Sequence, residues 1–118
     1  MSYETLTQEQ RDSVDALAQM VRALSGTLAR TLEQFQAVNS YWTGNIETIL
    51  SGLQASDVIP NKTGLAGAQG LTKSELTNLV GYMIVASATA DGASGSYNSN
   101  YHRSLYAKAA GPINIVNE

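Results

Sequence analysis

The sequence contains no cysteine, which excludes disulfide scaffolds, thiolate metal sites and cysteine nucleophiles. It has one histidine, His102, and no acidic residue lies within ten positions of it, so neither a histidine metal site nor a catalytic triad is expected. No apolar run approaches the roughly 20 residues of a membrane-spanning helix. The polar first five residues predict no secretory signal. We therefore expect no catalytic residues, no cofactor, no metal and no contact with a membrane.

Charged residues are also scarce. They make up 14% of the 118 residues, whereas ordinary soluble domains have about 25%. Ser, Thr, Asn and Gln together supply 37 residues, so the polar surface is neutral rather than ionic. The cores of protein interfaces are depleted in Lys, Glu and Asp, so this composition predicts a surface that partners cover. The seven basic residues are scattered among ten acidic ones, which predicts no direct binding of nucleic acid.

An apolar stripe with helical spacing runs through the N-terminal half of the chain. A possible capping box, Thr7 and Gln10, precedes it, and no proline interrupts residues 1–59. The spacing predicts a long helix or helical hairpin within residues 7–55. The stripe consists of Val14, Leu17, Val21, Leu24, Leu28, Leu32, Phe35, Val38, Trp42, Ile46, Ile49 and Leu53.

An unbroken helix over this range would be roughly 70 Å long, since each residue adds 1.5 Å. Compact domains of about 100 residues have a radius of gyration near 13 Å, so the helix either breaks or projects towards a partner. Glycine disfavours helix, which makes Gly26, Gly44 and Gly52 the candidate break points. We expect the break within residues 40–45, around Gly44.

The second half predicts two shorter helices joined by extended segments. Residues 56–71 have no helical or strand period, which predicts a long interaction loop. A capping box of Thr72 and Glu75 begins a helix over 72–91. A short helix over 101–110 ends at Gly111 and Pro112, and residues 111–118 form an extended tail. The predicted fold is a single all-α domain: one long N-terminal helix, continuous or broken, packed with two shorter helices.

Glycines before the second helix also raise the question of a phosphate-binding loop. Gly64, Gly67 and Gly70 precede its N-terminus, but Lys73 and Ser74 come two residues too late for a Walker A motif. The spacing also lacks the G-x-G-x-x-G of a dinucleotide loop. The glycines therefore predict a tight, closely packed turn rather than a nucleotide site.

The tripeptide Trp42-Thr43-Gly44 follows a long amphipathic helix in a small, cysteine-free chain. In this respect residues 7–55 resemble the WXG100 family of small secreted helical hairpins, in which this tripeptide makes the turn. The resemblance implies a helical binding module, and it ends where Gly52 and Pro60 cut the second helix short. A hairpin of two near-equal helices would favour this alternative.

Two further blocks resemble small structural proteins of tailed-bacteriophage virions. The first runs from Asp57 to Lys73, and the second is Leu105-Tyr-Ala-Lys-Ala-Ala-Gly-Pro112. The resemblance implies a non-enzymatic, many-copy component of the head or head–tail region, located in the virion and made in the host cytoplasm. Its partners would be copies of itself and other virion proteins such as the major capsid protein.

Assembly of that kind needs apolar and aromatic anchors, because such side chains dominate binding energy at interfaces. The N-terminal stripe would supply a packing seam, and the 56–71 loop, the tyrosines and the tail would contact neighbouring subunits. The predicted interface residues are Leu17, Leu24, Leu28, Phe35, Trp42, Ile59, Leu65, Tyr97, Tyr101, Tyr106, Ile113 and Ile115.

Overall fold

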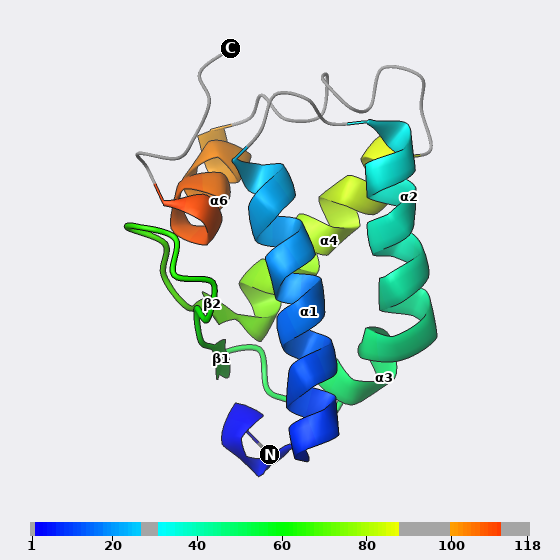
Figure 1. Cartoon of the computed structure of the whole chain (residues 1–118), viewed down its shortest axis with the longest axis vertical. Helices are drawn as coiled ribbons and strands as arrows, with labels where there is room; N and C mark the ends of the chain where they lie inside the picture. Colours follow the sequence, from blue (N-terminus) through cyan, green and yellow to red (C-terminus); the bar gives the residue numbers. More distant parts are fainter. Residues whose placement is uncertain (1, 27–30, 88–99, 112–118) are drawn as a thin grey trace.

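Figure 1 shows the computed structural model of the chain, which describes residues 2–26, 31–87 and 100–111. These ranges are predominantly helical, as the sequence predicts, with one small two-stranded sheet. The radius of gyration is 13.4 Å, which is the value of a compact domain and leaves no room for a projecting 70 Å helix.

The first helix, α1, spans Gln8–Ser25 and begins at the predicted capping box. Thr7 Oγ1 accepts a hydrogen bond from the backbone N–H of Gln10, and Gln10 Oε1 accepts one from that of Thr7. A short 3₁₀ turn, Tyr3–Thr5, precedes the helix, and Tyr3 is buried against it. One face of α1 enters the core through Val14, Leu17, Ala18, Val21 and Leu24.

The N-terminal helical region breaks after Gly26, so the prediction of a break at residues 40–45 is wrong. A new helix, α2 (Leu32–Tyr41), begins at a second capping box formed by Thr31 and Gln34. Its chain direction is opposite to that of α1 (Figure 1). The helix then continues past Gly44, because a single glycine weakens a helix by only about 1 kcal/mol.

A π-helical turn, η2 (Trp42–Ile46), joins α2 to the last helical turn, α3 (Glu47–Leu50). Val38 and Ile46 are both fully buried although eight residues separate them. At α-helical pitch, eight residues would rotate the second side chain about 80° away from the first. The wider π turn underwinds the helix and returns Ile46 and Leu50 to the core face.

Two short strands tie the loop region together. Strand β1 (Val58–Ile59) pairs antiparallel with β2 (Leu71–Thr72), with Val58 opposite Thr72 and Ile59 opposite Leu71. The prediction of a loop without secondary structure over 56–71 is therefore wrong at its two ends. The reason is physical: the two strands have only two residues each and eleven residues separate them, so no local period exists for sequence analysis to detect.

Helix α4 (Lys73–Ser87) follows β2 directly and starts at the predicted capping box. Thr72 Oγ1 accepts from the Glu75 N–H, and Glu75 Oε1 accepts from the Thr72 N–H. The helix crosses behind α1 and α2 and packs mainly against α2 (Figure 1). Four of its side chains are buried in the core: Leu76, Leu79, Val80 and Met83. The predicted end of this helix at residue 91 lies outside the described residues.

Helix α6 (Asn100–Ala110) lies beside the C-terminal half of α1 (Figure 1). Its end is the predicted Gly111, whose φ of 86° is a left-handed conformation that glycine adopts without strain. The N–H of Gly111 donates to the carbonyl of Ala107 at 2.8 Å. The predicted tail, apart from Gly111, lies outside the described residues.

Candidate functional site

The described residues contain no group of three or more His, Cys, Asp or Glu side chains that could hold a metal ion. The most polar buried arrangement in these ranges lies where the 60–70 loop crosses α1 and meets the end of α6. Gln69 N–H donates to the Lys108 carbonyl at 2.8 Å, so loop and helix are joined directly. We take this junction as the candidate site.

Arg22 is at the centre of the junction, with only 1% of its surface exposed. Its Nη1 donates to two carbonyl oxygens, those of Gln69 and Ala109, each at 2.8 Å. The Ala109 carbonyl belongs to the last turn of α6, where the helix dipole is negative and favours a cation. Burial lowers the pKa of the Arg22 guanidinium, because water no longer solvates its charge. Its Nη2 is buried without a hydrogen-bond partner.

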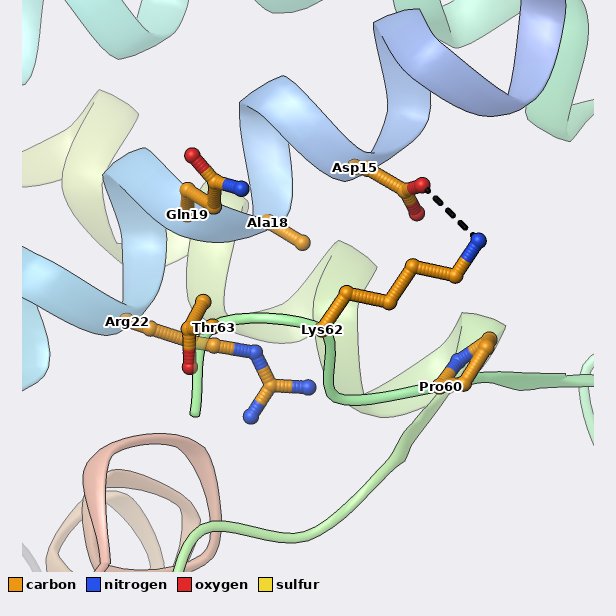
Figure 2. Close-up of a pocket in the computed structure, with 7 residues that line it drawn as sticks. All are labelled: Asp15, Ala18, Gln19, Arg22, Pro60, Lys62 and Thr63. Carbon is orange, nitrogen blue, oxygen red and sulfur yellow. Dashed lines mark ion pairs between the residues drawn. The ribbon is translucent and has the colours of Figure 1, made fainter. Parts of the chain in front are cut away.

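Lys62 lies on the solvent side of this junction and pairs with α1. Its Nζ lies 3.3 Å from Oδ2 of Asp15 and 5.0 Å from the ring centre of Tyr3. Figure 2 marks the ion pair with Asp15. The Tyr3 hydroxyl donates to both Asp15 oxygens at 2.8 Å. Burial, together with this hydrogen bond to a carboxylate, raises the pKa of Tyr3. These contacts connect the N-terminal turn, α1 and the 60–70 loop.

The loop itself is held by local hydrogen bonds. Asn61 Oδ1 accepts from both the N–H and the hydroxyl of Thr63, and Asn61 Nδ2 donates to the Ala68 carbonyl at 3.2 Å. Gly64 and Gly67 have φ values of 75° and 77°, which supports the predicted tight turns. Beside the loop is an open hollow of about 340 Å³, lined by Gln19, Ala23, Lys62, Thr63 and Leu65.

A second ion pair, between Glu75 and Lys108, joins the start of α4 to α6 at 2.8 Å. Partial burial opposes ionisation of Glu75, but the Lys108 ammonium and the Thr72 N–H bind the carboxylate and lower its pKa below the usual value. A lowered pKa means that ionised Glu75 stabilises the fold above its unfolded-state pKa, and that this contribution is lost as pH falls through the folded-state pKa.

We therefore expect the variant Glu75→Gln to be less stable than wild type by about 1 kcal/mol at pH 7, and equally stable at an acidic pH below the lowered folded-state pKa of Glu75. Glutamine keeps the capping bond to Thr72 but cannot form the ion pair with Lys108. Urea unfolding followed by circular dichroism at both pH values measures the difference. A difference that does not change with pH would contradict the ion pair as its source.

Of the eight predicted interface residues that the structure describes, five lie inside the chain's own core. Tyr101 is 53% exposed, while Trp42 and Leu65 are half-buried. Leu28, Tyr97, Ile113 and Ile115 lie outside the described residues. The packing seam thus contacts α4 and α6 of the same chain. The fully or nearly fully buried members are Leu17, Leu24, Phe35, Ile59 and Tyr106.

Sequence analysis missed Arg22 and Lys62. Arg22 lies one position after Val21 and outside the predicted stripe, so the sequence indicates a solvent-facing side chain; the carbonyls that bury it come from the 60–70 loop and α6. Lys62 gives no signal either, because its partner Asp15 is 47 positions away in the sequence and nothing local indicates the pairing.

The comparisons with known proteins identify no relative. No protein-family model, curated protein or solved structure matches the chain. Across the described ranges, no helix combines the length and the hydropathy that crossing a membrane requires. The WXG100 resemblance depends on a turn at Trp42-Thr43-Gly44, whereas these residues lie inside a helix that continues to Leu50.

Proposed function

We propose that the chain is a non-enzymatic structural subunit of a tailed-phage virion, which assembles in many copies. The resemblance of the 57–73 and 105–112 segments to virion proteins suggests this function, and the scarcity of charge supports an assembled surface. The apolar seam is used inside the chain, so assembly has to use residues that remain accessible.

One structural observation supports this proposal most directly. The two large apolar side chains that are most exposed in the described ranges are Val58 at 52% and Tyr101 at 53%. They belong to β1 and α6, two elements that lie on the same side of the molecule as the 60–70 loop (Figure 1), and this loop carries the half-buried Leu65. We call Val58, Leu65 and Tyr101 the loop-side surface. Aromatic and branched side chains on a surface with little charge are suited to subunit contacts.

The double variant Val58→Asp/Leu65→Asp tests this surface. Two carboxylates at a subunit contact would be desolvated without partners, so we expect at least a tenfold weaker association. Sedimentation velocity over a wide concentration range measures it. The control Ala37→Asp/Thr48→Asp adds the same charge at exposed positions of α2 and α3 and should associate like wild type.

Wild-type protein that remains a monomer at every concentration would contradict self-association. If both double variants associate equally weakly, the added negative charge weakens association in general, and Val58 and Leu65 do not form a specific contact surface. The virion itself gives a separate test, because a structural subunit must be present in gradient-purified particles in many copies per particle. Absence from such particles would overturn the proposal.

A second candidate is a helical binding module of the WXG100 type. The observation that favours it is the antiparallel hairpin of near-equal helices, Gln8–Ser25 against Leu32–Leu50 (Figure 1). Two observations argue against it. Helix α4 packs against α2, and Trp42-Thr43-Gly44 lies within a helix rather than at the turn between helices. Secretion of the chain from its source cell, with no copies in particles, would favour this candidate.

A further inference from the structure

The open hollow beside the 60–70 loop is a place where apolar side chains can be buried. Its volume is about 340 Å³, and its lining residues are Gln19, Ala23, Lys62, Thr63 and Leu65. Pockets that hold small ligands begin at about 300 Å³, so this hollow has room for a pair of branched side chains. Ala23 and Leu65 offer apolar surface, and the long polar side chains add their carbon stems.

Two contacts bring the C-terminal end of α6 to the rim of this hollow. Arg22, which is next to a lining residue of α1, donates to the Ala109 carbonyl at 2.8 Å. Gly111 approaches the 60–70 loop so closely that a Cβ at this position would overlap the carbonyl oxygen of Ala66, which follows Leu65. The chain therefore leaves α6 beside both walls of the hollow, the wall from α1 and the wall from the loop.

The sequence that follows Gly111 has an apolar pattern suited to such a place. Ile113 and Ile115 are two positions apart, so in an extended chain their side chains point to one side, while those of Asn114 and Val116 point to the other. Two to four residues of extended chain reach about 7 to 14 Å beyond Gly111. This reach is enough to bring both isoleucines to a hollow that begins at the end of α6.

We propose that Ile113 and Ile115 dock into the hollow of their own chain, against Ala23 and Leu65. Burial of two isoleucine side chains favours docking. The connection through Gly111 is short, so the tail has an effective concentration of the order of millimolar at its own hollow. The tail of a second copy would have to reach a similar concentration to compete. The side chains of the tail thus belong to the chain's own fold, whereas sequence analysis placed them at neighbouring subunits.

This proposal does not depend on the proposed virion function. It has one consequence for that function, because Leu65 belongs to both the hollow and the loop-side surface. A neighbouring copy that uses Leu65 would first have to displace the tail.

Relaxation of the amide nitrogens in the ¹⁵N-labelled full chain tests the docking. We expect order parameters above about 0.8 for the amides of Ile113 and Ile115, close to those of α6, whereas an undocked tail gives values below about 0.6. We also expect nuclear Overhauser effects between the methyl groups of Ile115 and those of Leu65. Wild-type order parameters below 0.6 at both isoleucines, or the absence of these effects, would overturn the proposal.

A variant of the hollow should release the tail. Ala23→Glu places a carboxylate at an exposed position of the hollow, where the docked isoleucines would remove it from water. The order parameters of Ile113 and Ile115 should then fall below about 0.6. The control Ala37→Glu makes the same change at an exposed position of α2 and should leave them at the wild-type values. Equal order parameters in Ala23→Glu and wild type would contradict docking at this hollow.

Variants of the tail test which of its faces docks. Ile115→Asn should shift the amide signals of Ala23 and Leu65, because it removes an apolar side chain from the hollow. Val116→Asn changes the opposite face of the tail and should leave these signals in place. Equal shifts in the two variants would overturn the assignment of the isoleucine face.

A mixture of equal parts of ¹³C-labelled and unlabelled chains distinguishes the chain's own tail from that of a second copy. For docking within one chain, the effects between Ile115 and Leu65 methyl groups occur only inside labelled chains and do not change on dilution. If they occur only between labelled and unlabelled chains, the tail docks on a second copy, and docking within one chain is overturned.

Discussion

Replacement of Gly111 by alanine is expected to lower the free energy of unfolding by about 3 kcal/mol. At φ 86° an alanine is strained, and its Cβ would overlap the carbonyl oxygen of Ala66 and lie 3.0 Å from the Ala68 nitrogen. The 60–70 loop would have to move away from α6. That movement disrupts the hydrogen bond from Gln69 N–H to Lys108 and the contacts of Gln69 with Arg22.

Gly64→Ala is the matched control for this prediction. Gly64 has a similar φ of 75°, but nothing lies within 4 Å of the position that its Cβ would occupy. It therefore reports the left-handed conformation alone, which costs about 1 kcal/mol for alanine. Urea unfolding of both variants, followed by far-ultraviolet circular dichroism, gives the two values. Equal losses would show that the close approach of Gly111 to the loop does not contribute.

Replacement of Arg22 by methionine should also cost about 3 kcal/mol, because the Gln69 and Ala109 carbonyls lose their buried donor. Methionine retains much of the apolar stem, so the loss reports the guanidinium rather than packing. The effect should be local to the junction of α1, the 60–70 loop and α6. Hydrogen exchange of the Gln69 amide, which donates to Lys108, should accelerate more than that of α2 amides.

Arg11→Met is the control, because Arg11 also donates to two backbone carbonyls but lies nearer the solvent. Water can replace its hydrogen bonds, so the loss should stay below about 1 kcal/mol. If Arg22→Met is as stable as wild type, the free energy lost by desolvating the guanidinium equals the free energy gained from its hydrogen bonds. The loop would then be held by its other contacts, among them the Gln69–Lys108 hydrogen bond, the Lys62–Asp15 ion pair and the β1–β2 pair.

Local chemistry made part of the fold predictable. The capping boxes of Thr7 with Gln10 and of Thr72 with Glu75 form as predicted, because all the residues of a capping box lie within four positions of the sequence. Thr31 and Gln34 carry the same signal, and it outweighs the glycine at position 44 in deciding where the second helix starts. Gly44 misled the prediction because a solvent-facing glycine weakens a helix by no more than about 1 kcal/mol.

Long-range partners made the rest unpredictable. A helical stripe shows that Leu17 and Phe35 are buried, but it does not show which chain supplies the opposing surface. Here α4 and α6 supply much of it, so these residues form a core rather than a seam between subunits. The candidate site depends on contacts of Arg22 with carbonyls 47 and 87 positions away, and no spacing rule reaches that far.

The π turn gives this helix one residue more than its buried face needs. A spacing of seven positions in ordinary α-helix, one fewer than the eight from Val38 to Ile46, would leave the two side chains within about 20° of a common direction. The surplus lies among Thr43, Gly44 and Asn45, all of which face solvent. Related chains can therefore differ in length by one residue at this position without changing their core. An alignment that shows a single-residue gap here would be recording the same fold.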